Sequence, residues 1–259
     1  MTDRDPASPV GVTRHGTALV VTINRPERAN ALDGATIAGL GAAFTAAEHD
    51  DTVRVVVLTG AGNQVFCAGM DLKARGDERV PPPGSQGLEV FMTRCYPLPV
   101  VAAVNGAAVG GGFELVLGSD LVVAAEHATF GMPEVKRGLV GAGCSTRMAA
   151  RVPPAIAFEL ALVGDSITAE RACALGLVNE VVPRDELLGR ALALADRIAA
   201  NAPLALRVTK QLVWDEARMH DAAEWAAIRA KAAPIFASDD AREGAAAFAE
   251  RRAPIWTGK

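Results

Sequence analysis

Two glutamates occupy positions from which a carboxylate can do acid–base chemistry. Glu114 follows three glycines and a phenylalanine in GAAVGGGFELVLG, a stretch made otherwise of small and apolar residues. Glu134 follows a proline in FGMPEVKRG. Two carboxylates flanking one water can take a proton from it and deliver a proton elsewhere. Taken singly, each has a plainer explanation: Glu114 as a charge favoured in a first helical turn, and Glu134 as a turn residue.

The glycines before Glu114 predict a site for negative charge. Gly110, Gly111 and Gly112 join an apolar segment to a helical one, and residues without a Cβ let a ligand approach the backbone closely. The free N–H groups of the first helical turn would point at that ligand. A nucleotide phosphate loop is disfavoured, because neither the G-x-x-x-x-G-K-[ST] nor the G-x-G-x-x-G pattern is present.

A third element is FCAGMDL, which comes after an apolar run that reads as a buried strand. Gly69 sits there beside the small Ala68. Glycine-containing turns past the carboxyl end of parallel strands are where α/β proteins tend to bind ligands. An ordinary tight turn is the alternative explanation for this element.

These elements need strands and helices that bring them together. Continuous apolar runs predict strands buried on both faces, and helical spacing after a possible N-cap at Asp33 predicts a helix. Strands are expected at residues 17–26, 53–60, 100–104 and 120–125, and helices at 31–50 and 113–118. Alternating buried strands and helices favour a parallel α/β arrangement.

The second part of the chain is helical in pattern from about Pro154 onward. Composition changes near Asn201, after which Ala-rich amphipathic segments follow, so we expect a core at residues 1–200 and a C-terminal helical region at 201–259. Consecutive prolines and glycines predict a surface loop at residues 76–87.

Composition limits the classes of partner and compartment. The chain has 259 residues, 50% of them hydrophobic, a formal net charge of −4 and scattered Lys and Arg. This disfavours nucleic acid as a partner, and a small anion would need local bases such as Arg25 with Arg28 or Lys73 with Arg75. No apolar run has the length of a signal peptide or membrane span, which favours a cytoplasmic protein.

Cysteine and histidine show neither metal-ligand spacing nor a disulfide framework, so we expect reduced thiols and no metal. The residues concerned are Cys67, Cys95, Cys144, Cys173, His15, His49, His127 and His220.

Taken in order, FCAGMD, NGAAVGGGFELVLGSDLVVA and FGMPEVKRGLVGAG resemble the enoyl-CoA hydratase/isomerase (crotonase) family. The resemblance runs from INRPERANALD to DDAREGAAAFAERRAPIW. It implies an α/β fold of the ClpP/crotonase type, a spiral of repeated β-β-α units followed by a C-terminal helical trimerisation region. Homotrimers, or homohexamers built as dimers of trimers, are the implied assemblies.

The resemblance also assigns roles to residues. Ala68 and Gly111 match the two positions whose backbone N–H groups form an oxyanion hole for a thioester carbonyl, and Glu114 and Glu134 match the catalytic glutamates. Phe248 and Arg251 fall where family members contact the coenzyme A of a neighbouring subunit. Positions implied for binding coenzyme A or substrate are Arg28, Ala29, Ala68, Gly69, Met70, Asp71 and Gly111.

The implied function is reversible addition of water to a trans-2-enoyl-CoA, giving a 3-hydroxyacyl-CoA, as in the β-oxidation of fatty acids. Glu114 would activate water for attack on the β-carbon, and Glu134 would protonate the α-carbon. Coenzyme A is part of the substrate, so no separate cofactor is expected. The alternatives are isomerisation of an enoyl-CoA, a carnitinyl-CoA dehydratase-like reaction, thioester hydrolysis, and binding of a CoA thioester without turnover.

Three residues depart from the commonest hydratase pattern: Phe113 before the first glutamate, Met132 two before the second, and Cys144 within a usual Gly-Gly. With GGFEL, PE-x-K and PPAI they look closer to a carnitinyl-CoA dehydratase-like branch. The acyl group is not readable from the sequence, because the loop from Pro81 to Gly87 and the helices after Pro154 are expected to shape its pocket.

Overall fold

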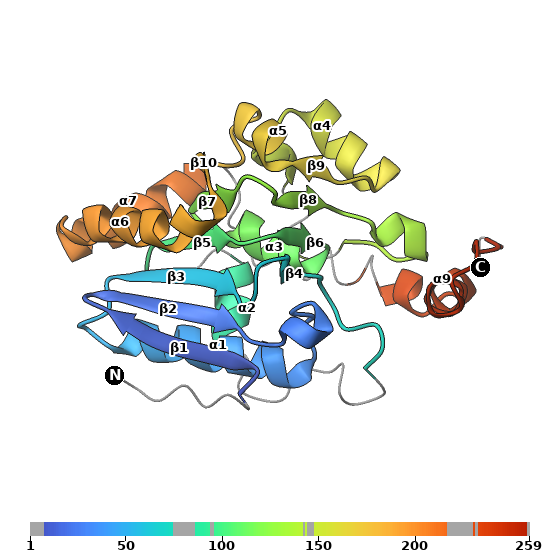
Figure 1. The fold of residues 1–259 in the computed structure, drawn as a ribbon, viewed down its shortest axis with the longest axis horizontal. Helices are drawn as coiled ribbons and strands as arrows, with labels where there is room; N and C mark the ends of the chain where they lie inside the picture. Colours follow the sequence, from blue (N-terminus) through green and yellow to red (C-terminus); the bar gives the residue numbers. More distant parts are fainter. Residues whose placement is uncertain are drawn as a thin grey trace.

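A six-stranded sheet forms the centre of the fold, in the order β1-β2-β3-β5-β7-β10 (Figure 1). Its antiparallel edge pair is β1 with β2, and every other pairing is parallel. The strands are Val10–His15 (β1), Ala18–Ile23 (β2), Val55–Gly60 (β3), Val100–Val104 (β5), Leu121–Ala125 (β7) and Glu180–Val182 (β10). The computed structural model describes residues 8–74, 86–93, 96–141, 143, 148–216, 230 and 233–257.

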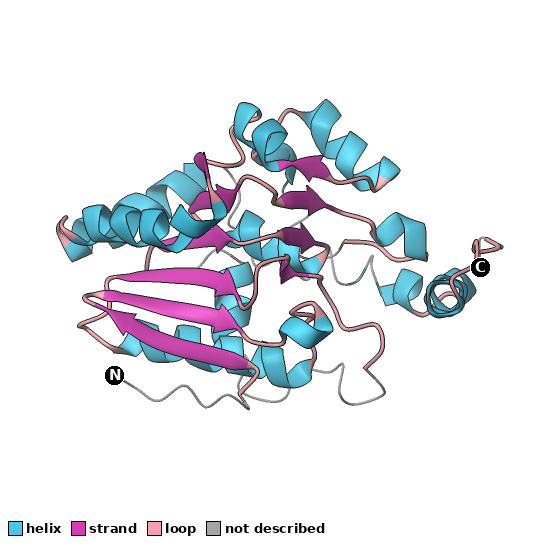
Figure 2. Cartoon of the chain, viewed as in Figure 1, coloured by secondary structure: helices cyan, strands magenta, loops and turns pink. Residues whose placement is uncertain are grey.

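A second, four-stranded sheet has the order β4-β6-β8-β9. Its strands are Val65–Cys67 (β4), Ala107–Val109 (β6), Thr129–Gly131 (β8) and Ile167–Thr168 (β9). Strands β4, β6 and β8 each follow a strand of the large sheet, so the chain passes from one sheet to the other at every turn (Figure 2). The expected spiral of β-β-α units is confirmed by this repeated passage.

Helices cover both faces of the large sheet. The α-helices are α1 (Gly34–His49), α2 (Gln86–Met92), α3 (Gly111–Gly118), α4 (Pro154–Phe158), α5 (Ala169–Ala174), α6 (Leu187–Ala199), α7 (Pro203–Glu216) and α9 (Asp239–Glu250). Shorter helical turns are η1 (Pro26–Arg28), η3 (Glu134–Arg137), η5 (Glu159–Val163) and η6 (Arg184–Glu186). Within the described ranges, no helix is long and apolar enough to cross a membrane.

Two apolar layers hold this arrangement together. One lies against α1 and α3 and includes the fully buried rings of Phe44, Phe113 and Phe130. The other lies under α6, whose Ala191 and Ala195 pack on the strands β3, β5 and β7. Small residues at a spacing of four let this helix approach the sheet closely. Buried apolar surface of this kind contributes roughly 25 cal/mol for each Å² removed from water.

The strands and helices expected from the sequence are confirmed, and the strands β1, β4, β6, β8, β9 and β10 are additions. Asp33 is the N-cap of α1, where its side chain accepts the Thr36 N–H at 2.8 Å. Strand β1 escaped prediction because VGVTRH mixes polar and apolar residues at an edge. Most of the expected loop at residues 76–87 lies outside the described residues, and its last two residues begin α2. Arg75, Cys95, Cys144 and His220 also lie outside the described residues.

Helix α7 is joined to the core by hydrogen bonds to the Asp120 side chain. The Asp120 carboxylate accepts hydrogen bonds from Lys210 Nζ at 2.8 Å, from Trp214 Nε1 at 2.8 Å and from the Val100 N–H at 2.7 Å. The side chains of Asp120 and Lys210 are 17% and 10% exposed. A charge pair so shielded is costly to break, because the remaining partner keeps an uncompensated charge.

Replacing Asp120 by alanine is expected to lower the free energy of unfolding by about 3 kcal/mol, because the shielded Lys210 ammonium loses its paired carboxylate and the Val100 N–H loses its acceptor. Urea denaturation measures this change. Glu159→Gln is the matched control, since Glu159 pairs with Arg171 at an exposed surface. An Asp120 variant as stable as that control would contradict the role of the Asp120 hydrogen bonds in holding α7.

Candidate active site

A cavity of about 620 Å³ contains every residue predicted for catalysis and for the oxyanion hole, together with those implied for coenzyme A contact except Arg251. Its walls come from η1, from the loop after β4, from the start of α3, from η3 and from α9. The predicted site residues that line it are Arg28, Ala29, Ala68, Gly69, Met70, Asp71, Gly111, Glu114 and Glu134. The fold therefore brings four separate segments of sequence to one place.

Glu114 enters this cavity from the first turn of α3. Its N–H donates to the carbonyl of Gly110 at 2.9 Å, and Gly110 is the N-cap residue with φ +55°. The Oε1 atom of Glu114 accepts the Gly143 N–H at 2.8 Å. A Cβ on Gly143 would lie 2.2 Å from Oε2 of Glu114, so any side chain at this position would displace the Glu114 carboxylate. One hydrogen bond therefore holds the backbone of Glu114, and another holds its carboxylate.

Glu134 begins η3 and has an unusual proton affinity. Burial is the largest cause that raises its pKa from 4.5 to about 7, and the negative charge of Glu114 acts in the same direction. A backbone hydrogen bond and the charge of Arg137 oppose this rise in pKa. Its Oε2 atom is buried without a hydrogen-bond partner among the described residues. Near neutral pH Glu134 is thus present in both protonated and ionised forms, and it has one oxygen without a partner among the described residues.

The loop after β4 changes one expectation. The Ala68 N–H donates to the carbonyl of Ala29 at 3.1 Å, so it is not available to a ligand, and its assignment to the oxyanion hole is wrong. The Met70 N–H, two residues later, donates to no group among the described residues. The same holds for the Gly111 N–H at the start of α3. Two free backbone donors therefore lie at the cavity, and they belong to Met70 and Gly111.

Close backbone contacts place these two donors side by side. A Cβ on Gly111 would lie 3.7 Å from the Met70 nitrogen, and a Cβ on Gly69 would lie 2.9 Å from the Gly111 nitrogen. A Cβ on Gly112 would lie 2.0 Å from the carbonyl oxygen of Cys67, which explains the glycine there. Gly69 also has φ +82°, a conformation that favours glycine. Glycines are needed at these positions because the backbone at the end of β4 and in the loop after it lies against the backbone at the start of α3.

Basic and acidic side chains line the mouth of the cavity. Glu27, Arg28 and Lys73 are among them. The Asp71 side chain is turned away from this role, because it pairs with Arg25 Nη2 at 3.2 Å and is 10% exposed. Arg28 of η1 and Lys73 of the loop after β4 are thus cations in the lining of this cavity.

Helix α9 closes the other side of the cavity. Phe248 lines the cavity of its own chain, whereas the family resemblance implied a neighbour's site, and Arg251 does not line it. The guanidinium carbon of Arg137 lies 4.7 Å from the Phe248 ring centroid. A Cβ on Gly244 would lie 2.0 Å from the Arg137 carbonyl oxygen, so α9 and η3 touch backbone to backbone.

Several contributors were missed from the sequence. Arg137 stands in the quoted motif FGMPEVKRG, three residues after Glu134, and that spacing was the available signal. Gly143, Leu139 and Val140 also line the cavity; they stand in the quoted motif FGMPEVKRGLVGAG, but nothing in it marks them individually for a role.

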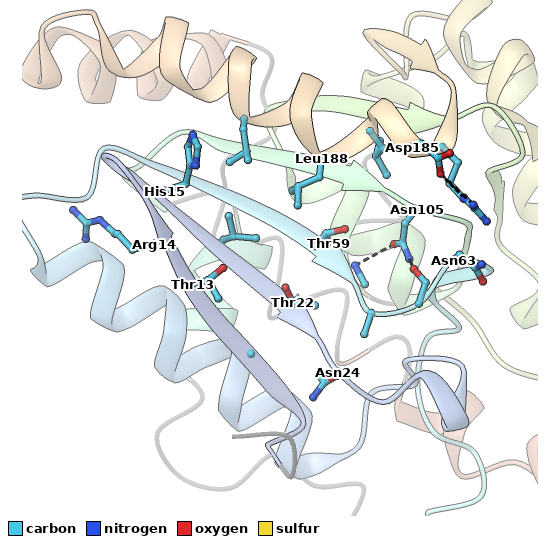
Figure 3. A pocket seen from close by; sticks show the side chains of 18 residues that line it. Thr13, Arg14, His15, Thr22, Asn24, Thr59, Asn63, Asn105, Asp185 and Leu188 are labelled. Atoms are coloured by element: carbon cyan, nitrogen blue, oxygen red, sulfur yellow. Dashed lines mark hydrogen bonds and ion pairs between the residues drawn. The ribbon is translucent and has the colours of Figure 1, made fainter. Parts of the chain in front are cut away.

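A second hollow, of about 730 Å³, lies between α6 and the outer face of β1, β2 and β3 (Figure 3). Thr13, Thr22 and Thr59 form its floor, and Leu188 reaches over them. The Asn105 carboxamide at its end accepts the Gly60 N–H and donates to the Gly62 carbonyl. This hollow lacks the pair of glutamates that distinguishes the first cavity.

Comparisons with known proteins show the family of this chain. The chain matches the family described as enoyl-CoA hydratase/isomerase over residues 13–259. It is 41% identical over 260 residues to a carnitinyl-CoA dehydratase of Salmonella typhi, covering 96% of this chain and 98% of that protein.

Solved structures match the whole fold. The crystal structure of a carnitinyl-CoA hydratase from Mycobacterium avium has a TM-score of 0.90 at 40% identity, covering 97% of this chain and 99% of that one. An enoyl-CoA hydratase from Mycobacterium tuberculosis has a TM-score of 0.75 at 46% identity, covering 97% of this chain and 100% of that one. The chain belongs to the enoyl-CoA hydratase/isomerase family and has the crotonase fold.

The pKa of Glu134 predicts a pH-dependent stability. A pKa raised from 4.5 to about 7 in the folded protein gives stability that is full below 4.5 and is lost as the pH rises through 7. Relative to Glu134→Gln, which is neutral at every pH, the wild type should lose about 3 kcal/mol across that range. Denaturant unfolding of both proteins between about pH 4 and pH 9 measures this loss. A constant difference between them would contradict a buried, protonated Glu134.

Proposed function

We propose that the protein catalyses the reversible addition of water to a trans-2-enoyl-CoA thioester, giving a 3-hydroxyacyl-CoA. By its family the chain is an enzyme of the hydro-lyase type that acts on CoA thioesters. The observation that carries the finer proposal is the pairing of Glu114 and Glu134, in different hydrogen-bonding environments, beside two free backbone N–H groups. Each of these groups has a task in water addition.

The two glutamates would divide the proton transfers between them. Glu114, which accepts a backbone N–H, acts as the base that takes a proton from water as its oxygen attacks the β-carbon. Glu134, with its pKa raised to about 7, delivers its proton to the α-carbon. Dehydration uses the same two groups with exchanged roles.

The backbone donors would stabilise the charge that grows on the thioester oxygen. Attack at the β-carbon moves electrons toward the carbonyl and produces an enolate-like oxygen. The N–H groups of Met70 and Gly111 would donate to that oxygen, and Gly111 also begins α3, whose helix dipole favours negative charge there. One such donor typically lowers the barrier by ~2.7–4 kcal/mol.

The substrate would lie along the cavity with its nucleotide at the mouth. Arg28 and Lys73 offer charges for the phosphates of coenzyme A, and Phe248 with Arg137 closes the opposite wall. Leu139 and Val140 give an apolar lining for the acyl chain. The reaction needs no cofactor beyond the coenzyme A of the substrate.

The remaining properties follow from the same proposal. We propose a cytoplasmic enzyme that assembles as a homotrimer or homohexamer through residues 201–259, with the active site carried by residues 1–200. Exposed apolar residues on α7 support this assembly, because Leu204, Val208 and Leu212 are 76%, 55% and 62% exposed. Light scattering after gel filtration measures the assembly directly.

Several relatives are named for carnitinyl-CoA, so the acyl group needs its own test. Turnover is measured with short and medium trans-2-enoyl-CoA thioesters and with carnitinyl-CoA. Preference for carnitinyl-CoA would assign the chain to dehydration of that substrate. Conversion of 3-enoyl-CoA to 2-enoyl-CoA without hydration would indicate an isomerase.

Replacing either glutamate by glutamine is expected to lower kcat for hydration by about 10²–10⁴-fold, because an amide neither accepts nor delivers the proton. Stopped assays at saturating enoyl-CoA give kcat for Glu114→Gln and Glu134→Gln. Glu126→Gln is the matched control, since Glu126 is an exposed glutamate outside the cavity. Near-normal kcat in both cavity variants would refute the assignment.

Gly143→Ala is expected to lower kcat about tenfold or more while the protein stays folded, because the new Cβ would overlap the Glu114 carboxylate and displace it. Steady-state kinetics measure kcat and KM separately. Gly189→Ala serves as the control, since a Cβ there meets nothing within 4 Å. Unchanged kcat in Gly143→Ala would show that the contact with Glu114 is unimportant.

A further inference from the structure

Arg25 holds together two loops that meet at the active site. Its Nη1 donates to the Ala31 carbonyl at 2.6 Å, and its Nη2 lies 3.1 Å from Asp33 and 3.2 Å from Asp71. The side chain of Arg25 is 15% exposed. Arg25 therefore binds Ala31 and Asp33, on either side of Leu32. In the other loop it binds Asp71, the residue after Met70.

The two loops are also paired through their backbones. The Leu32 N–H donates to the Gly69 carbonyl at 2.8 Å, and the Asp71 N–H donates to the Leu32 carbonyl at 2.9 Å. This short parallel bridge between Leu32 and Met70 lies within the set of residues that Arg25 grips.

The bridge fixes the direction of the Met70 N–H. The peptide between Gly69 and Met70 is planar and trans, so its N–H points away from its carbonyl. Since the Gly69 carbonyl accepts from Leu32, the Met70 N–H must point to the opposite side, where Gly111 lies. Any rotation of this peptide would move a donor away from the thioester oxygen.

The backbone of Arg25 is itself fixed. Its N–H donates to Oδ1 of Asn30 at 3.0 Å, and Nδ2 of Asn30 donates to the carbonyls of Ala61 and Val65 at 2.9 and 2.8 Å. Asn30 is fully buried. The guanidinium is thus anchored to the end of β3 and to β4, the framework on which the site is built.

We infer that Arg25 is a positioning residue of the oxyanion hole: through Asp71 and the Leu32 bridge it sets the orientation of the Met70 N–H. The inference rests on the proposed function for the identity of the thioester oxygen. Arginine suits this task because its planar fork reaches three acceptors at once, whereas a lysine ammonium is a point charge on a flexible stem.

The test uses two conservative substitutions, Arg25→Lys and Asp71→Asn, in the full-length protein. Each should lower kcat for hydration by about tenfold, with the KM of Arg25→Lys within about threefold of wild type, because the donor acts mainly on the transition state. The double variant should be no slower than the slower single variant, since both changes break one linkage.

A spectroscopic readout separates positioning from simple structural support. Acetoacetyl-CoA forms an enolate that absorbs in the near ultraviolet, and an oxyanion hole stabilises that enolate. The apparent pKa of bound acetoacetyl-CoA should rise by about one unit in both variants, the equivalent of a tenfold weaker stabilisation. This readout does not require hydration, so it stays valid if the protein catalyses a different reaction of its family.

Asp50→Asn is the matched control. It removes a carboxylate that pairs with a different arginine, Arg14, at 2.9 Å, outside the two loops that Arg25 holds. This variant should leave kcat and the enolate pKa at wild-type values. Wild-type kcat and enolate pKa in Arg25→Lys and Asp71→Asn would overturn the inference, and Asp71→Asn decides alone if Arg25→Lys fails to fold. A wild type that bound acetoacetyl-CoA without stabilising its enolate would overturn it as well. Enolate stabilisation without turnover of any enoyl-CoA would refute only the proposed hydration.

Discussion

The active site depends on one steric constraint, the contact between the start of α3 and the segment that leaves β4. Gly112 lies against the Cys67 carbonyl so closely that a methyl group would lie 2.0 Å from it. This contact brings the Gly111 N–H, at the start of α3, beside the Met70 N–H in the loop after β4. Donors fixed in this way need no reorganisation when charge develops on a ligand, which is the main advantage of a preorganised site.

The same geometry places two chemically identical side chains, Glu114 and Glu134, in different surroundings. Glu114 extends from the helix that supplies a donor, and a backbone N–H from a neighbouring loop meets its carboxylate. Glu134 sits on a turn enclosed by apolar surface and by α9, so desolvation dominates its proton affinity. Placing one carboxyl group on a helix start and the other in a buried turn gives the same residue type two different environments for its proton.

Most of the framework was readable from the sequence because it follows from local patterns. The N-cap at Asp33 and the buried runs of β3, β5 and β7 are properties of neighbouring residues. The oxyanion donor was misassigned to Ala68 for a non-local reason: the carbonyl of Ala29, distant in sequence, consumes that N–H. Gly143 was missed for the same kind of reason, since its contact with Glu114 joins segments that no periodicity relates. Pairing between distant loops decided which backbone groups remain free.

The contact between α9 and η3 has a consequence for the order in which the site is completed during biosynthesis. Gly138 and Gly244 let the two backbones touch, and α9 follows every strand of the two sheets in chain order. The strands of the spiral are therefore synthesised before this packing partner exists. The turn that carries Glu134 receives its contact with α9 only after the rest of the cavity wall has been made. A nascent chain can thus hold the neighbouring N–H groups of Met70 and Gly111 before α9 packs against the turn of Glu134.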